Sequence, residues 1–235
     1  MKYNFYNNIL IIKSIIYRLI SMLIFSLIFG FKFAIFAGLL AFLIYLTYDY
    51  IFSKIFNIRA ENKGAVLWFT GLPCSGKSTL ADAVNEYLKK HGYKTERLDG
   101  DIVRNGRLSD DLGFSKEDRK KNINRINFVS KLLSRNKIIT LCSFVSPYKT
   151  VRDEIRNNVT NFVEIFVHAT PLTCANRDVK GMWKLAMEGK IKNFTGYDDP
   201  YELPKNPEIY INTEMENLEK SKEKVIQYLK KEKLI

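Results

Sequence analysis

Gly71-Leu72-Pro73-Cys74-Ser75-Gly76-Lys77-Ser78-Thr79 matches the G-x-x-x-x-G-K-[ST] pattern of a phosphate-binding loop. An apolar run of strand length, residues 65–70, comes before it, and a helical pattern over residues 77–90 overlaps its end. A strand, a glycine-rich turn and a helix in this order are the context that the pattern requires. The alternative is a chance glycine turn, which would not require a strand before it and a helix after it. We therefore predict a phosphate-binding loop.

The parts of this loop have distinct physical roles toward an anionic ligand. Gly71 and Gly76 allow the backbone to curl so that successive N–H groups point inward. The helix that follows directs its positive end at the same place. Lys77 supplies a charge for the β- and γ-phosphates of a triphosphate, and the hydroxyl of Ser78 is placed to ligate Mg²⁺.

Charge is distributed unevenly along the 235 residues. The first sixty residues carry six of the 37 Lys and Arg residues and one of the 25 acids, which leaves +7 of the net +12 on the remainder. That remainder is a mixed-charge chain long enough to bury a full core. It contains no basic run with interleaved aromatics, so nucleic acid is not expected as a partner. Three scattered cysteines without metal-ligand spacing favour a reducing compartment.

The first sixty residues contain two apolar runs without charge, residues 19–31 and 33–48. Each is shorter than the ~20 residues that a spanning helix needs. Arg18 and Lys32 relieve this shortage, because long basic side chains can reach the membrane interface. A helix pair that lies on the membrane or packs on a partner is the alternative to a spanning hairpin.

We accordingly expect a membrane domain over residues 1–58, with transmembrane helices at about residues 11–29 and 33–52. A polar linker, residues 59–64, then leads to a globular domain over residues 65–235. Basic residues flank the outer ends of the hairpin, which predicts that both ends are cytoplasmic. The expected localisation is a multi-pass membrane protein whose globular domain faces the cytoplasm.

Asp99-Gly100-Asp101 forms a second candidate site. A short strand over residues 94–98 delivers both carboxylates at its carboxyl end, the edge of an α/β sheet at which ligands bind. Two carboxylates near a triphosphate suggest Mg²⁺ handling or a base for a substrate hydroxyl. An ordinary Asp-Gly turn is the alternative. The strand at residues 138–141 is followed by Cys142-Ser143 rather than by an acid, which favours Asp99 and Asp101.

A helix expected over residues 115–135 begins with a capping-box-like Ser115-Lys116-Glu117-Asp118. Arg119 and Asn122 are three residues apart and lie on one face of its first turns. Solvated surface charge for Arg119 and a core position for Phe114 are the alternatives.

A basic, glycine-punctuated segment over residues 177–201 separates strands expected at residues 162–167 and 209–211. It has the character of a lid over phosphates, because a solvated loop would explain its lysines but not its clustered aromatics. An amphipathic helix over residues 215–231 closes the chain. The order of elements predicts an α/β fold with a parallel sheet, flanking helices and a lid.

Together these segments resemble the adenylylsulfate kinase family over about residues 64–213. The matching motifs are Trp68-Phe69-Thr70-Gly71-Leu72, Leu98-Asp99-Gly100-Asp101, Asp111-Leu112-Gly113-Phe114-Ser115, Glu117-Asp118-Arg119, Ser146-Pro147-Tyr148, Arg177-Asp178-Val179-Lys180-Gly181, Asn193-Phe194-Thr195-Gly196 and Asp198-Asp199-Pro200-Tyr201-Glu202. The resemblance implies a P-loop, nucleoside-kinase-like fold and phosphorylation of the 3′-hydroxyl of adenosine 5′-phosphosulfate by Mg²⁺ and ATP. Ile102, Lys149 and Trp183 depart from the residues usual in the family, near the expected acceptor site.

Site roles follow from the resemblance, residue by residue. Residues 71–79 and Arg177 are expected to bind ATP, with Ser78 and Asp99 on the metal. The residues expected around the acceptor are Asp101, Arg104, Phe114, Arg119, Asn122, Val145, Ser146, Lys180, Asn193 and Phe194. Phe114 and Phe194 would stack on the purine, whereas Arg104, Arg119 and Asn122 would contact the phosphosulfate and sugar.

The expected catalytic residues are Lys77, Asp99, Asp101 and Ser146. Ser146 matches a serine described in the family as a phosphorylated intermediate. Its neighbours, residues 144–148, include no His, Asp or Glu that could activate it. We therefore expect Ser146 to line the acceptor site and Asp101 to orient the 3′-hydroxyl and take its proton.

Two other functions are compatible with the motifs. One is a related kinase that acts on another nucleotide-linked anion, for example in surface-polysaccharide decoration, and the other is a non-enzymatic, membrane-anchored nucleotide-binding module. Expected partners are the substrates, a membrane, a second copy in a homodimer and a sulfate adenylyltransferase that supplies the acceptor. Residues 9–56 also resemble a family of two-helix membrane domains of unassigned function, on Ile12-Lys13-Ser14-Ile15-Ile16-Tyr17-Arg18.

Overall fold

The computed structural model describes most of the chain from residue 63 onward. The described residues are 63–105, 108–113 and 115–235, together with Ile20 and residues 23–24, 39–40 and 42–47. The side chains of Asp101, Arg104 and Asn105 also lie outside the description. The chain divides into two compact units, Met1–Ala60 and Glu61–Ile235.

A five-stranded parallel sheet in the order β2-β3-β1-β4-β5 forms the centre of the second unit. The strands are β1 Ala65–Thr70, β2 Thr95–Asp99, β3 Ile139–Ser143, β4 Phe162–His168 and β5 Ile209–Asn212. β1 lies between β3 and β4, and all six of its residues are buried. From β1 the chain passes to the edge strand β2, returns to β3 beside β1, and then crosses to β4 and β5 on the other side of β1. The carboxyl end of β1 is therefore a topological switch point, where α/β proteins bind ligands.

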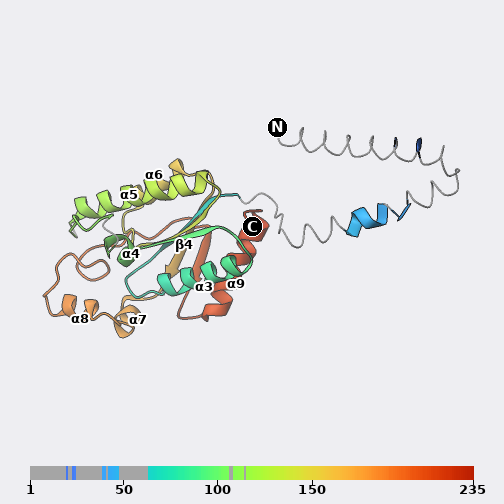
Figure 1. Ribbon diagram of the computed structural model, residues 1–235. Helices are drawn as coiled ribbons and strands as arrows, with labels where there is room; N and C mark the ends of the chain where they lie inside the picture. Colours follow the sequence, from blue (N-terminus) through green and yellow to red (C-terminus); the bar gives the residue numbers. More distant parts are fainter. Residues whose placement is uncertain are drawn as a thin grey trace. The chain divides into compact units, whose positions relative to one another are not determined.

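Helices cover both faces of this sheet (Figure 1). On one face lie α3 Lys77–Lys90 and α9 Leu218–Lys231, and on the other lie α5 Lys116–Arg135 and α6 Lys149–Asn158. The shorter helices of this unit are α4 Gly100–Asn105, α7 Pro171–Asn176 and α8 Met182–Met187. Side chains alternate between the two faces of a strand. Leu67 of β1 accordingly packs in the cluster with Leu80 of α3 and Ile226 of α9. Trp68 packs in the opposite cluster with Ile126 of α5 and Ile155 of α6.

The α/β fold with a parallel sheet that the sequence predicts is confirmed. The expected start of the long helix is also present, because the Ser115 hydroxyl accepts a hydrogen bond of 3.1 Å from the backbone N–H of Asp118. This cap satisfies one of the backbone donors that a helix leaves unpaired at its N-terminus.

The membrane hairpin expected in the first sixty residues is not supported. Most of the two expected spans, residues 11–29 and 33–52, lies outside the described residues. Among the residues that the structure describes, no helix combines the length and the apolar character needed to cross a membrane. This finding contradicts the predicted multi-pass membrane localisation, and the localisation is withdrawn.

Candidate active site

The phosphate-binding loop lies at the carboxyl end of β1 and leads directly into α3. Gly71 has a φ of 155°, and a Cβ atom there would lie 2.2 Å from the carbonyl oxygen of Val167. Only glycine allows that approach of the loop to β4. Gly76 begins the helix in the left-handed region with a φ of 99°. Both glycines of the sequence pattern are thus explained by backbone geometry.

Lys77 lies beneath the loop rather than on the surface. Its side chain is 9% exposed, and its Nζ donates a hydrogen bond of 2.6 Å to the carbonyl oxygen of Leu72. Burial lowers the pKa of this ammonium group from 10.5 to about 8, because a buried charge loses its hydration. A triphosphate bound in the loop would restore the lost stabilisation of the charge.

Asp99, the last residue of β2, is joined to three polar side chains through its Oδ2 atom. Ser78 Oγ donates to it at 2.7 Å, Arg97 Nη2 donates at 3.2 Å, and Ser143 Oγ donates as well. Asp99 and Ser143 are paired in the register of β2 and β3, which explains their contact. Ser78 and Asp99 therefore bring two oxygen ligands together beside the loop, as the sequence analysis expects for a metal.

A cavity of about 1130 Å³ opens at this edge of the sheet. The predicted residues that line it are Pro73, Cys74, Gly76, Lys77, Ser78, Thr79, Asp99, Arg119, Asn122, Val145, Ser146, Arg177, Lys180, Asn193 and Phe194. Ligand pockets usually measure ~300–1000 Å³. The cavity thus has room for two ligands, one at the loop and one beyond it.

Some predicted residues do not line this cavity. Ser75 is fully buried inside the loop, and Leu72 lines a separate cavity of about 540 Å³ on the other side. Asp101 and Arg104 belong to α4, and their side chains lie outside the described residues, as does all of Phe114. Their assigned roles stay predictions.

Asn122 and Arg119 lie on α5 at the cavity. Asn122 is 8% exposed, and its Oδ1 has no hydrogen-bond partner within the described part of the chain. A buried carbonyl without a partner is costly, so this atom suits a ligand that donates a hydrogen bond. Arg119 donates to Asp199 at 3.2 Å and also to Thr195 and to the carbonyl oxygen of Asn193. It holds α5 against the segment expected to form the lid.

Trp183 of α8 connects this lid to the phosphate-binding loop. Its Nε1 donates 3.2 Å to the carbonyl oxygen of Pro73, and its ring lies edge-on to Phe194 with centroids 5.1 Å apart. Both rings are buried, in one cluster with Leu72. In the sequence, Trp183 stands out only as a departure from the residue usual in the family. Its contact with the loop could not be found there, because the partner is 110 residues away.

Arg177 reaches the loop region through Thr213. Its two terminal nitrogens donate to Thr213 Oγ1 at 2.8 Å and to the Thr213 carbonyl oxygen at 2.9 Å. Thr213 Oγ1 in turn donates 3.0 Å to the carbonyl oxygen of Ser75. Thr213 is a residue of the site that sequence analysis missed, since no local pattern marks it.

Ser146 lies on the turn after β3, where it is 3% exposed and has a φ of 45°. Its Oγ accepts a hydrogen bond of 3.1 Å from Trp68 Nε1. An indole N–H donates only, so it cannot take a proton from the serine. The preceding residue, Val145, accepts 2.7 Å from Thr70 Oγ1 through its carbonyl oxygen. These contacts hold the turn against β1 and do not activate the hydroxyl.

A glycine-rich loop at a switch point, a buried lysine and an adjoining cavity of about 1130 Å³ define a P-loop phosphotransferase that acts on a small molecule. Within that class, the family model for adenylylsulphate kinase matches residues 63–212. The chain belongs to the adenylylsulphate kinase family.

Individual relatives agree with this assignment. A probable adenylyl-sulfate kinase from Pseudomonas aeruginosa is 55% identical over 166 residues, which cover 71% of this chain and 77% of the relative. The structure of the Mycobacterium tuberculosis APS kinase CysC with AMPPNP and APS is 36% identical, with a TM-score of 0.68 over 72% of this chain and 98% of that one. A hexameric APS kinase from Thiobacillus denitrificans is 33% identical, with a TM-score of 0.58 over 74% of this chain and 30% of that one.

Proposed function

We propose that the cavity binds ATP at the phosphate-binding loop and adenosine 5′-phosphosulfate beneath the lid, and that the enzyme transfers the γ-phosphoryl group to the acceptor's 3′-hydroxyl. The product is 3′-phosphoadenylyl sulfate. The observation that carries this proposal is one cavity that is lined by Lys77 of the phosphate-binding loop and also by Asn122 and Phe194. Membership of the adenylylsulphate kinase family supports the choice of acceptor.

On the donor side, the backbone N–H groups of residues 71–79 other than Pro73 and the Lys77 ammonium neutralise the phosphates, with Arg177 beside them. Ser78 and Asp99 would hold Mg²⁺. Their two oxygens suit this ion, which takes one or two protein ligands and completes its shell with phosphate and water. When bound, Mg²⁺ would supply positive charge that offsets the negative charge of the phosphates.

On the acceptor side, Phe194 and Phe114 stack on the purine, and the unpaired Asn122 carbonyl accepts a hydrogen bond from the substrate. Val145, Ser146 and Asn193 line the same part of the cavity. The cationic residues assigned to the phosphosulfate are Arg104, Arg119 and Lys180. Arg119 also holds the lid, so its contact with substrate would accompany lid closure.

Asp101 orients the 3′-hydroxyl and accepts its proton late in the transfer. Asp99 is poorly suited to that role, because its Oδ2 already accepts from Ser78, Arg97 and Ser143. Ser146 contributes to acceptor binding without becoming phosphorylated. Its hydroxyl contacts a donor, Trp68 Nε1, and direct transfer needs no second nucleophile.

A product assay with several acceptors tests this function. The full chain is incubated with Mg²⁺, ATP and either adenosine 5′-phosphosulfate or another nucleotide-linked anion, and the products are separated by chromatography. We expect 3′-phosphoadenylyl sulfate from the first acceptor at a far higher kcat/KM than from the others. A higher kcat/KM with a different nucleotide-linked anion would instead identify the related kinase activity. ATP binding without turnover of any acceptor would favour a nucleotide-binding module.

A homodimer and a supplying sulfate adenylyltransferase remain predicted partners. The hexameric Thiobacillus protein supports self-association within the family. Sedimentation of the full chain, with and without the adenylyltransferase, tests both.

A further inference from the structure

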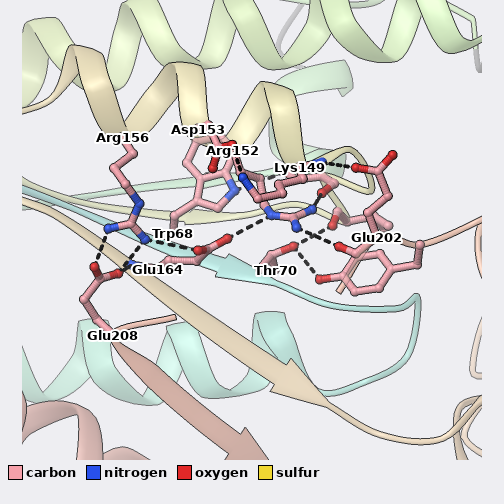
Figure 2. Close-up of polar contacts among 12 residues, drawn as sticks. Trp68, Thr70, Lys149, Arg152, Asp153, Arg156, Glu164, Glu202 and Glu208 are labelled. Carbon is pink, nitrogen blue, oxygen red and sulfur yellow. Dashed lines mark hydrogen bonds and ion pairs between the residues drawn. The ribbon is translucent and has the colours of Figure 1, made fainter. Parts of the chain in front are cut away.

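A cluster of charged residues that the proposed mechanism does not use joins α6 to β4 and to the segment that contains Glu202 (Figure 2). At its centre is Arg152 of α6, whose side chain is 2% exposed. Its Nε donates 2.8 Å to Glu164 Oε1 on β4. Its two terminal nitrogens each donate 2.6 Å to a backbone carbonyl oxygen, one of Ser146 and one of Glu202.

These two carbonyls belong to two segments, the turn after β3, which lines the cavity, and the segment that follows the expected lid. Ser146 holds a left-handed backbone conformation that residues other than glycine seldom adopt. The Glu202 N–H donates 2.9 Å to the Pro147 carbonyl oxygen, and the Glu202 carboxylate accepts 2.6 Å from the Lys149 N–H. One guanidinium group therefore joins the turn that carries Ser146 to the segment that follows the lid.

Arg156, one turn further along α6, provides an internal comparison. It donates 3.1 Å to Glu164 Oε2 and also binds the Glu208 carboxylate, with a contact of 2.9 Å to Oε2 (Figure 2). Within the described part of the chain, the Arg156 side chain donates hydrogen bonds only to carboxylates, whereas Arg152 also donates to the turn that carries Ser146. The same charged cluster thus contains one arginine that contacts the acceptor turn and one that does not.

We propose that Arg152, oriented by Glu164, is a positioning residue of the acceptor site: it fixes the Ser146 turn against the end of the lid. Buried ion pairs add little net stability in general, because desolvation offsets their attraction. A planar guanidinium group can serve a carboxylate and two separate carbonyls at once, which a lysine ammonium on its single stem cannot do in the same geometry. The inference rests on the proposed function, because it assigns the turn to the acceptor.

Arg152→Lys and the matched control Arg156→Lys test the inference in the full chain. Each retains its charge next to Glu164. Arg152→Lys should raise the KM for adenosine 5′-phosphosulfate about tenfold or more, the fold-change expected for a lost charge-assisted hydrogen bond, and leave the KM for ATP unchanged. Arg156→Lys should leave both KM values unchanged, even if it lowers the melting temperature as much as Arg152→Lys does. Equal changes in acceptor KM for the two variants would overturn the inference.

A second measurement does not depend on the acceptor's identity. Amide hydrogen exchange in the peptide that contains residues 144–149 should be faster in Arg152→Lys than in wild type, and unchanged in Arg156→Lys, without any nucleotide. If Arg152→Lys does not fold, Arg152→Gln, which buries no charge, takes its place in both measurements. Unchanged exchange at the turn would refute the positioning role. If exchange at the turn is faster in Arg152→Lys but the wild-type protein does not phosphorylate the acceptor, only the proposed function is refuted.

Discussion

At the scale of single residues, the burial of Lys77 has consequences for how the donor binds. The ammonium group is 9% exposed and donates to the Leu72 carbonyl, and its pKa of about 8 places its titration near working pH. The Asp99 carboxylate, in contrast, accepts hydrogen bonds from the side chains of Arg97, Ser78 and Ser143. The donor side thus combines a buried ammonium group with a carboxylate that accepts several hydrogen bonds.

The affinity for ATP should depend on pH through Lys77. The protonated form binds phosphate, so affinity is full below about pH 8 and falls as the pH rises through that value, by at most about tenfold per pH unit. Binding at pH 8.5 should also take up a proton, which calorimetry in buffers of different ionisation enthalpy detects. Lys77→Arg is the control, since a guanidinium group stays charged and should remove the pH dependence. An ATP affinity that stays constant from pH 7 to 10 in the wild type would contradict the buried, titrating lysine.

The two residues assigned to the acceptor hydroxyl should respond differently to substitution. Asp101→Asn should lower kcat about a hundredfold or more, the usual effect of removing a general base. Ser146→Ala should retain substantial kcat, because the serine hydroxyl contacts Trp68 and no base. Steady-state kinetics with saturating ATP give both values. A phosphoenzyme labelled from ATP alone, absent in Ser146→Ala together with all turnover, would show that the serine is an obligatory intermediate.

At the scale of elements, the lid is held on the phosphate-binding loop by packing. The Trp183 indole donates to the Pro73 carbonyl and lies edge-on to Phe194. Gly196, two residues after Phe194, has a left-handed backbone with a φ of 95°. A Cβ atom there would lie 2.7 Å from Leu72 Cδ2 and 3.1 Å from Trp183 Cη2. The lid and the loop therefore share one packed cluster, so a change in the lid is expected to reach both substrates.

Gly196→Ala should weaken binding of both substrates. The added methyl group forces Leu72 and Trp183 apart, and the residue must also keep a left-handed backbone. Gly189→Ala is a matched control, because Gly189 has a φ of 71° but no atom within 4 Å of an added Cβ. Gly189→Ala should lower the free energy of unfolding by only about 1 kcal/mol, the cost of a left-handed backbone at a residue with a Cβ atom. Thermal melts and KM values for ATP and the acceptor separate the two effects, and equal KM values for both variants would show that the lid cluster does not couple to the sites.

At the scale of the whole molecule, every strand of the sheet and all three buried clusters belong to the unit Glu61–Ile235. The family model also begins at residue 63. The described core of this unit is therefore built without residues from the first sixty, as expected for an independent domain. The finer boundaries, with a linker at residues 59–64 and a domain over residues 65–235, remain predictions.

A chain of residues 61–235 should accordingly fold and keep the kcat and both KM values of the full chain. Thermal unfolding followed by circular dichroism, together with the product assay, tests this in one preparation. The full chain measured in parallel is the control. A truncated chain that binds ATP but loses acceptor turnover would mean that the first sixty residues contribute to the site.

The sequence by itself determined the features that depend on neighbouring residues. A phosphate-binding loop needs contiguous backbone N–H groups and glycines at set positions, so residues 71–79 were recognisable, as was the Ser115 cap. The parallel sheet followed from alternating strand and helix patterns. The apolar runs in the first sixty residues led to a predicted membrane localisation that is contradicted, since no helix among the described residues is long and apolar enough to cross a membrane.

Only the tertiary structure decided which distant residues support the site. Trp183 meets Pro73 across 110 positions, Asp99 meets Ser143 across 44, and Arg152 meets the Glu202 carbonyl across 50. One trace was visible in advance, since Glu164 is an acid inside the otherwise apolar strand β4, and a buried acid requires a partner. Its partner could not be predicted from the sequence. The acceptors that a guanidinium group reaches depend on their positions in space, and those positions depend on how the strands and helices pack.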